Sequence, residues 1–273
     1  MQANRSWSPP IGPLGRLSAA AAARAAALDP RRSELESLAQ EVPVGSGFRS
    51  ALRRADVAII AEVKRRSPSK GVINASIDAA AQAAAYASGG AAALSILTEP
   101  DEFGGSIGDL AAARRATALP TLKKDFHVHP MQVLEARAAG ASALLLIARA
   151  LPPAQLRTMA DQAYELGLEV LVEVRSEAEL EDALAIDDAV IGINSRDLET
   201  LVIDPAVTTR LMALIPPDRI AIAESGVSTR LDVERVASIG ADAVLVGSSI
   251  SAAPDPIAAV AALTGVTRGR RGG

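Results

Sequence analysis

The stretch Ser-Ile-Gly-Ala-Asp-Ala-Val at residues 238–244 joins the end of one predicted helix to the start of one predicted strand. Ala-Ala-Gly-Ala-Ser-Ala-Leu at 138–144 and Ala-Ser-Gly-Gly-Ala-Ala-Ala-Leu at 87–94 are close variants of the same joint. A glycine that ends a helix and leads directly into an apolar strand is typical of a helix–strand connection. Its repetition predicts that one βα unit recurs along the chain.

Outward from these joints, short apolar runs alternate with amphipathic helical stretches from Val57 onward. The predicted strands are Val57–Val63, Ala92–Leu97, Thr121–Lys124, Ser142–Ile147, Glu169–Val174, Val190–Ile193, Arg219–Ala223 and Ala243–Val246. Such alternation specifies a parallel sheet, and about eight strands are what a closed (β/α)8 TIM barrel needs. A doubly wound open sheet is the alternative, because periodicity does not reveal whether a sheet closes.

We expect three regions: an N-terminal helical extension packed on the barrel at 1–47, a (β/α)8 barrel catalytic domain at 48–265 and a disordered tail at 266–273. The 49% hydrophobic content is enough for one large core. Alanine has the highest helix propensity, so Leu17–Leu28 predicts a helix, and a polar helix follows at Ser33–Glu41. A signal peptide is a weaker interpretation of the first stretch, because Arg24 interrupts it.

The composition argues against several classes of protein. A net charge of −4 offers no general attraction to nucleic acid, although a phosphate could bind locally. No apolar run approaches the roughly 20 residues that cross a bilayer, so we expect no membrane partner. The absence of cysteine excludes disulfides and cysteine nucleophiles and fits the cytoplasm. We expect a cytoplasmic protein that is a monomer or weak homodimer, and its expected partner is a small phosphorylated molecule.

Polar residues gather where the predicted strands end. They are Glu62, Lys64, Lys123, Lys124, Asp125, Glu173, Asn194, Arg196, Glu224, Ser225, Gly247, Ser248 and Ser249. In a barrel these ends share one face, where the βα loops build the catalytic site. The alternative is a set of structural ion pairs, because a buried charge is costly unless paired. Glu62 in particular could form a structural ion pair with Lys64.

The lysines are distributed unevenly. Of 28 basic residues only Lys64, Lys70, Lys123 and Lys124 are lysines, all in two strand-to-loop segments. Arginine effectively never deprotonates, whereas a partly buried lysine can hold or release a proton. We assign Lys64 and Lys124 to the site and give Lys70 and Lys123 surface or supporting roles.

Small residues after the last two strands predict a phosphate pocket. Gly226 follows the seventh strand, and Gly247 and Ser248 follow the eighth, where such barrels often bind phosphate with backbone amides. Ser67 in the first loop could add a hydroxyl. Ordinary turns are the alternative, since glycine and serine are common in them.

Four segments together resemble the indole-3-glycerol-phosphate synthase family, with similarity from about Phe48 to Ile250. They are Ile60–Gly71 (IAEVKRRSPSKG), Leu122–Phe126 (LKKDF), Ile191–Leu198 (IGINSRDL) and Ala223–Gly226 (AESG). The resemblance implies a lyase of tryptophan biosynthesis that needs no cofactor and no metal. It would convert 1-(2-carboxyphenylamino)-1-deoxyribulose 5-phosphate into indole-3-glycerol phosphate, carbon dioxide and water.

The same resemblance implies roles for individual residues. Lys124 would be the general acid of ring closure and Glu173 the base that assists dehydration. Lys64 would hold the substrate carboxylate, with Glu62 and Asn194 orienting groups nearby; how acid and base work divides between the two Lys/Glu pairs stays open. The remaining predicted contacts are Arg196, Glu224, Ser225, Phe103 and Phe126 with the substrate, and Ser67, Gly226, Gly247 and Ser248 with its phosphate.

Some features depart from the family pattern or leave alternatives. His127 and His129 stand where the family resemblance predicts an apolar residue and an aspartate, and with Asp125 they could suggest zinc. The role of Trp7 is open. Phosphoribosylanthranilate isomerase would share the phosphate end, but that family uses a Cys/Asp pair and this chain has no cysteine. A non-catalytic phosphate-ligand binding protein is the other alternative.

Overall fold

The computed structural model describes residues 9–271. Within this range eight parallel strands close into a barrel in the order β1-β10-β9-β8-β7-β6-β5-β4, so the open doubly wound sheet is wrong. The strands are β1 (Ala58–Val63), β4 (Ala93–Leu97), β5 (Thr121–Lys124), β6 (Ala143–Ile147), β7 (Glu169–Val174), β8 (Val190–Asn194), β9 (Ala221–Glu224) and β10 (Ala243–Val246). Each predicted strand is present, with ends that differ by at most two residues.

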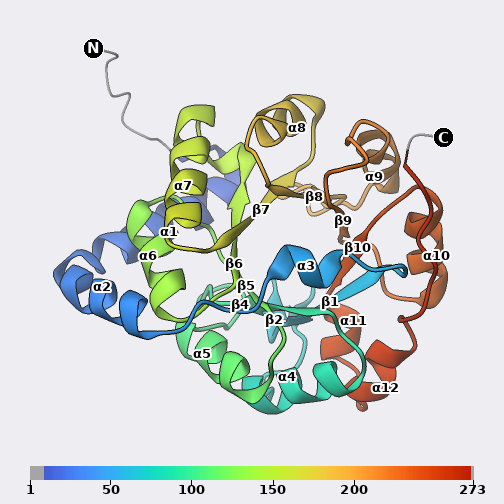
Figure 1. Ribbon diagram of the computed structural model, residues 1–273, viewed down its shortest axis with the longest axis horizontal. Coiled ribbons are helices and arrows are strands. Elements are labelled where there is room, and N and C mark those ends of the chain that lie inside the picture. Colours follow the sequence, from blue (N-terminus) through green and yellow to red (C-terminus); the bar gives the residue numbers. More distant parts are fainter. Residues whose placement is uncertain (1–8, 272–273) are drawn as a thin grey trace.

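Helices surround the strands in a ring (Figure 1). They are α4 (Ala79–Ser88), α5 (Ile107–Ala116), α6 (Pro130–Ala138), α7 (Pro153–Glu165), α8 (Glu177–Leu184), α9 (Pro205–Met212), α10 (Arg230–Ser238), the short α11 (Ser248–Ser251) and α12 (Pro256–Ala261). The strands are buried on both faces, because one face fills the barrel and the other meets this ring. This double burial is why the strands read as apolar runs in the sequence.

The repeated joint of the sequence has one backbone geometry. Gly90, Gly140, Gly167 and Gly240 end α4, α6, α7 and α10, and their φ angles are +91°, +79°, +76° and +92°. At each joint the residue after the glycine donates its N–H to the carbonyl five positions earlier, over 2.8–3.1 Å. This is the hydrogen bond of a Schellman motif, whose left-handed residue is easiest for glycine. Each joint therefore turns a helix end into the next strand in the same way.

The N-terminal segment forms helices that pack on the barrel. Helix α1 (Gly12–Ala26) buries Leu14, Ser18, Ala21 and Ala25, whose spacing places them on one helical face, and it contacts α6. After the short turn η1 (Asp29–Arg31), α2 (Arg32–Glu41) lies outside the ring against α6 (Figure 1). The predicted helices are thus present, and α1 begins five residues earlier than expected. Trp7 lies outside the described residues.

The amino-terminal ends of the strands are covered by other parts of the chain. Helix α3 (Phe48–Leu52) buries Phe48 and Leu52, and the N–H of Arg49 donates to Glu169 Oε2 at the start of β7 over 2.9 Å. Arg268 and Arg271 both bind the Asp242 carboxylate just before β10. These arginines belong to the stretch expected to be a disordered tail, 266–273, of which residues 272–273 lie outside the described range. Within residues 9–271, no helix is long and apolar enough to span a membrane.

Candidate active site

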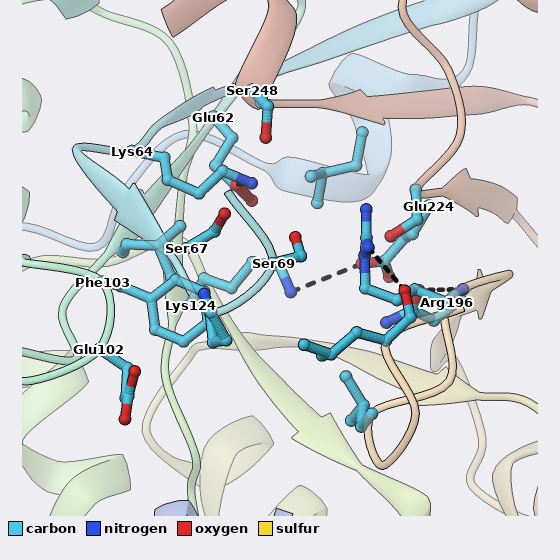
Figure 2. A pocket seen from close by; sticks show the side chains of 18 of the residues that line it. Glu62, Lys64, Ser67, Ser69, Glu102, Phe103, Lys124, Arg196, Glu224 and Ser248 are labelled. Carbon is cyan, nitrogen blue, oxygen red and sulfur yellow. Dashed lines mark hydrogen bonds and ion pairs between the residues drawn. The ribbon is translucent and has the colours of Figure 1, made fainter. Parts of the chain in front are cut away.

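A cavity of about 460 Å³ lies at the carboxyl ends of the strands. All fourteen predicted site residues line it: Glu62, Lys64, Ser67, Phe103, Lys124, Phe126, Glu173, Asn194, Arg196, Glu224, Ser225, Gly226, Gly247 and Ser248. Figure 2 shows Glu62, Lys64 and Ser67 on one side of the cavity, with Glu224 and Arg196 on the other. The structure thus brings Lys64, Lys124 and Glu173, from three distant segments, around one space.

Strand alternation directs the central lysine into this cavity. Lys124 ends β5 and faces the barrel interior, whereas its neighbour Lys123 points outward and pairs with Glu135 of α6 over 2.6 Å. Lys123 is only 1% exposed, so its role is supporting and the surface alternative is wrong. One strand end therefore carries a structural ammonium on one face and a cavity ammonium on the other.

Lys124 lies among three carboxylates. Its Nζ is 3.5 Å from Glu173 Oε2 and 3.6 Å from Glu224 Oε2. Burial alone would lower the pKa of Lys124, but the charges of Glu173, Glu224 and Glu62 outweigh it and raise the pKa above its ordinary value. The ammonium is therefore protonated at neutral pH, and it can donate a proton to a strongly basic oxygen that forms beside it.

Glu224 has the opposite electrostatic character. Burial raises the pKa of Glu224 to about 8, and the charges of Glu173 and Glu62 add to this rise while Lys124 opposes it. Its Oε1 has no hydrogen-bond partner in the described part of the chain. Gly192 on the adjacent strand β8 leaves the room for this oxygen, because a Cβ there would lie 2.1 Å from it. Glu224 is thus a buried carboxyl group whose pKa lies well above that of an exposed glutamate.

A second Lys/Glu pair stands at the end of β1. Lys64 Nζ is 2.5 Å from Glu62 Oε1, and both side chains reach the cavity. Gly247, after β10, gives this pair room, since a Cβ at this position would lie 2.4 Å from Glu62 Oε1 and 2.8 Å from Lys64 Nζ. The pair therefore has both features considered from sequence: Glu62 holds Lys64, and the two together face the cavity.

Asn194 and Arg196 hold the loop after β8. Asn194 Oδ1 accepts the N–H of Arg196 over 3.0 Å, and the Arg196 guanidinium donates to the carbonyl of Leu201 over 2.9 Å. Arg196 also forms a β-bridge with Ile203. These contacts close the loop on itself and keep the guanidinium at the cavity wall.

The turn after β9 has an unusual backbone. Ser225 and Gly226 have φ angles of +63° and +70°, a left-handed conformation that is uncommon for serine. The hydroxyl of Ser195 donates to the Ser225 carbonyl over 3.2 Å and supports this turn. Across the cavity mouth, Ser248 starts α11 and Ser67 lies in the small hairpin of β2 (Arg66–Ser67) and β3 (Gly71–Val72). The hydroxyl and backbone groups expected at a phosphate therefore come together from three loops.

Two phenylalanines form an apolar part of the wall. The ring centroids of Phe103 and Phe126 are 6.3 Å apart, with a tilt of 41° between the planes. Phe103 comes from the loop after β4 and Phe126 from the loop after β5, next to Lys124. A planar aromatic group could pack on these rings while its substituents reach the charged residues.

The two histidines have structural partners. His127 Nδ1 lies 2.7 Å from the carbonyl of Leu145, and burial, reinforced by the charge of Lys123, lowers the pKa of His127 to about 3. His129 caps α6 by accepting the N–H of Met131 over 3.2 Å. Among residues 9–271, no group of three or more histidine, aspartate or glutamate side chains is placed to hold a metal ion.

Several residues of the cavity wall were not predicted from the sequence. Helix α1 contributes Pro13, Leu14, Arg16 and Leu17, and the βα loops add Lys70, Glu102, Leu198 and Leu201. The sequence predicted that α1 packs on the barrel, but a helix pattern does not reveal which end of the barrel the helix reaches. Gly192 was also missed, because its importance depends on Glu224 of the next strand.

Comparisons with known proteins agree with this geometry. A family model described as indole-3-glycerol phosphate synthase matches residues 15–263. Curated relatives of that name include one from Nocardioides sp., 50% identical over 214 residues (78% of this chain, 82% of the relative), and one from Opitutus terrae, 46% identical over 236 residues (84% and 89%). Among solved structures, thiamine phosphate pyrophosphorylase from Pyrococcus furiosus has a TM-score of 0.58 at 16% identity, over 80% of this chain and 96% of that chain, which shows the fold alone.

Proposed function

Because the chain belongs to the indole-3-glycerol phosphate synthase family, we propose that the residues around Lys124 carry out the reaction of that family. The enzyme is a carbon–carbon lyase of tryptophan biosynthesis. It converts 1-(2-carboxyphenylamino)-1-deoxyribulose 5-phosphate into indole-3-glycerol phosphate, carbon dioxide and water. The observation that carries the residue assignment is the ammonium of Lys124 inside the cavity, between Glu173 and Glu224.

Lys124 acts as the general acid of ring closure. The ring carbon that bears the carboxylate forms a bond to the ribulose carbonyl carbon, and the carbonyl electron pair moves to its oxygen. An alkoxide is far more basic than an amine, so the Lys124 ammonium can donate its proton to that oxygen despite its raised pKa. Carbon dioxide then leaves, and the electrons of the broken bond restore the aromatic ring.

Glu173 acts as the base of the dehydration step. Loss of the new hydroxyl as water requires a proton on that hydroxyl and the removal of a proton from the neighbouring ring carbon. Glu173, beside Lys124, takes the proton from carbon, and Lys64 supplies the proton to the leaving hydroxyl while Glu62 holds it in place. Asn194 orients groups around the reacting centre.

The rest of the cavity binds the substrate. Phe103 and Phe126 contact the anthranilate ring, and Arg196, Glu224 and Ser225 line the space around the sugar chain. The phosphate of the substrate binds at four small residues on three loops: Ser67, Gly226, Gly247 and Ser248. Lys64 pairs with the substrate carboxylate until carbon dioxide leaves.

Several broader assignments belong to the same proposal. Residues 1–47 form the extension, 48–265 the catalytic barrel and 266–273 a tail in which Arg268 and Arg271 bind the barrel. The absence of cysteine supports a cytoplasmic location. We expect a monomer or weak homodimer with a small phosphorylated substrate and with neither nucleic acid nor membrane as a partner.

Two measurements test the assignment. Purified protein incubated with the ribulotide and no added metal should yield indole-3-glycerol phosphate, followed by its fluorescence, and carbon dioxide. In single-turnover assays, Lys124→Met and Glu173→Gln should each slow product formation by about 10²–10⁴-fold. Near-native turnover in both variants would refute the assigned roles, and binding without any turnover by the native protein would favour a non-catalytic binding protein.

A further inference from the structure

Arg24 joins the N-terminal extension to two loops of the barrel. It lies in the last turn of α1, where its Nη2 is 2.8 Å from Asp125 Oδ1 and its Nη1 is 3.5 Å from Glu99 Oε1. Glu99 is 0% exposed and Asp125 is 6% exposed. One guanidinium is thus shared by two buried carboxylates that come from different βα loops, and the planar arginine fork suits such a shared contact.

Glu99 organises the loop that carries Phe103. Its carboxylate accepts three backbone N–H groups, those of Asp101 over 3.1 Å, Glu102 over 2.7 Å and Phe103 over 3.0 Å. A carboxylate bound to consecutive backbone donors fixes the local chain direction. The orientation of Glu99 therefore determines where the Phe103 ring enters the cavity.

Asp125 organises the loop after β5 in a similar way. It stands between Lys124 and Phe126, its Oδ1 accepts the N–H of Phe126 over 2.8 Å, and its Oδ2 accepts the hydroxyl of Thr98 over 2.7 Å. Thr98 precedes Glu99, so this bond also ties the two loops together. The rings of Phe103 and Phe126, which these two loops carry, lie against each other.

We propose that Arg24 is a positioning residue that acts through Asp125 and Glu99 to place Lys124 and the aromatic wall of Phe103 and Phe126. Arg24 does not line the cavity itself, so any effect of its replacement on catalysis must pass through the two carboxylates. This role rests on the function proposed above and adds that the extension controls the geometry of the site.

The first test compares three single variants. Arg24→Met removes the guanidinium, and Arg24→Lys keeps the charge but loses the fork. Arg31→Gln is the matched control, because Arg31 is in the same extension, its side chain is 51% exposed and it pairs with the similarly exposed Glu34. A displacement of catalytic groups by about 1 Å can cost up to 10²-fold in rate, so we expect Arg24→Met to raise KM and lower kcat by about tenfold each. Arg24→Lys should fall between it and the native protein, and Arg31→Gln should match the native protein.

The second test asks whether Arg24 acts through the aromatic wall. Phe103→Leu is measured alone and together with Arg24→Met. If Arg24 acts by placing Phe103, the increase in KM of the double variant should equal the larger single increase. Increases that multiply would overturn the coupling, and native KM and kcat in Arg24→Met would overturn the role of Arg24.

Controls separate this inference from folding and from the proposed function. Circular dichroism and thermal melting show whether each variant is folded at the assay temperature, and Arg24→Lys carries the test if Arg24→Met does not fold. A native KM and kcat in folded Arg24→Lys would then count against the positioning role. Titration with indole-3-glycerol phosphate, followed by fluorescence, measures binding without turnover. If the native protein neither binds indole-3-glycerol phosphate nor converts the ribulotide, the proposed function is refuted. If the native protein is active and Arg24→Met has the same KM and kcat, only this inference is refuted.

Discussion

Two buried carboxyl groups at opposite ends of the barrel, Asp242 and Glu224, have opposite surroundings. At the amino-terminal end, Asp242 accepts the N–H of Ala221 over 2.8 Å and binds both Arg268 and Arg271. At the carboxyl end, Glu224 is 3.6 Å from Lys124 through one oxygen, and its other oxygen has no hydrogen-bond partner within residues 9–271. Both carboxylates are buried on neighbouring segments, but only the first is fully satisfied.

This difference separates stability from function. A buried carboxylate with a complete set of donors holds the fold, and its removal leaves its partners unpaired. An incompletely satisfied carboxylate is unfavourable for the folded state, yet it leaves hydrogen-bonding capacity for a substrate. We therefore expect substitution of Asp242 to change stability and substitution beside Glu224 to change activity.

The largest expected effect is at the amino-terminal end. Asp242→Ala removes the shared partner of Arg268 and Arg271, and breaking such a buried pair costs about 3–5 kcal/mol of unfolding free energy. Urea unfolding should show this loss, while kcat of the folded enzyme should stay near native. Asp218→Ala, an exposed residue at the same end, is the control and should change stability little. A large fall in kcat for Asp242→Ala at native stability would contradict the separation.

The next largest effect tests the space beside Glu224. In Gly192→Ala the new Cβ would lie 2.1 Å from Glu224 Oε1 and 3.0 Å from Leu171 Cδ1, so the carboxyl group must leave its position near Lys124 Nζ. We expect kcat to fall by about 10²-fold, as for other displaced catalytic groups. Gly108→Ala is the matched control, because a Cβ there meets only Ser106 Oγ at 3.5 Å. Native kcat in Gly192→Ala would show that the position of Glu224 does not matter.

A smaller effect concerns pH. The pKa of Glu224 is raised from 4.5 to about 8, so between these values the folded protein binds more protons here than the unfolded chain. Its contribution to stability therefore falls as pH rises through this window. Glu224→Gln should remove this fall, which thermal melting at pH 5 and pH 8 would detect. Equal pH dependence in Glu224→Gln and the native protein would exclude a raised pKa; Glu177→Gln, an exposed control, should keep the native dependence.

The smallest effect is at the rim of the cavity. Arg16 of α1 lines the mouth and has no ion-pair partner in the described part of the chain, so it is free to attract the anionic substrate. We expect Arg16→Gln to lower kcat/KM about threefold at low ionic strength and less at high salt, because exposed charges are screened over about a Debye length. A salt-independent loss would indicate direct contact with the substrate instead of long-range attraction.

The strands could be predicted because local sequence determines them. Burial on both faces makes each strand an apolar run, and glycine marks the helix ends before them. The predicted strand 219–223 begins two residues before β9. In the structure Arg219 precedes the strand, and its side chain donates to the carbonyls of Leu184 and Ile186. The hairpin of β2 and β3 was not predicted, since two-residue strands carry no periodicity.

The site could be located only in part. The rule that strand ends share one face placed Lys124, Glu173 and Glu224 in one cavity before any geometry was known. Contacts between distant segments could not be predicted in this way. Arg24 and Asp125 are 101 positions apart, and nothing in the alanine-rich sequence around Arg24 indicates which carboxylate it meets. The clearance that Gly192 gives to Glu224 likewise depends on the register of two strands.

The glycine joints offer natural breakpoints for recombination. Gly90, Gly140, Gly167 and Gly240 leave their helices with nearly the same backbone angle and the same hydrogen bond. If the segment between any two of them is exchanged with that of a homologue, the backbone direction at both junctions with the barrel should stay the same. Chimeric barrels joined at these glycines should therefore fold with whole βα segments replaced. Chimeras joined at other positions should lose the register between neighbouring strands.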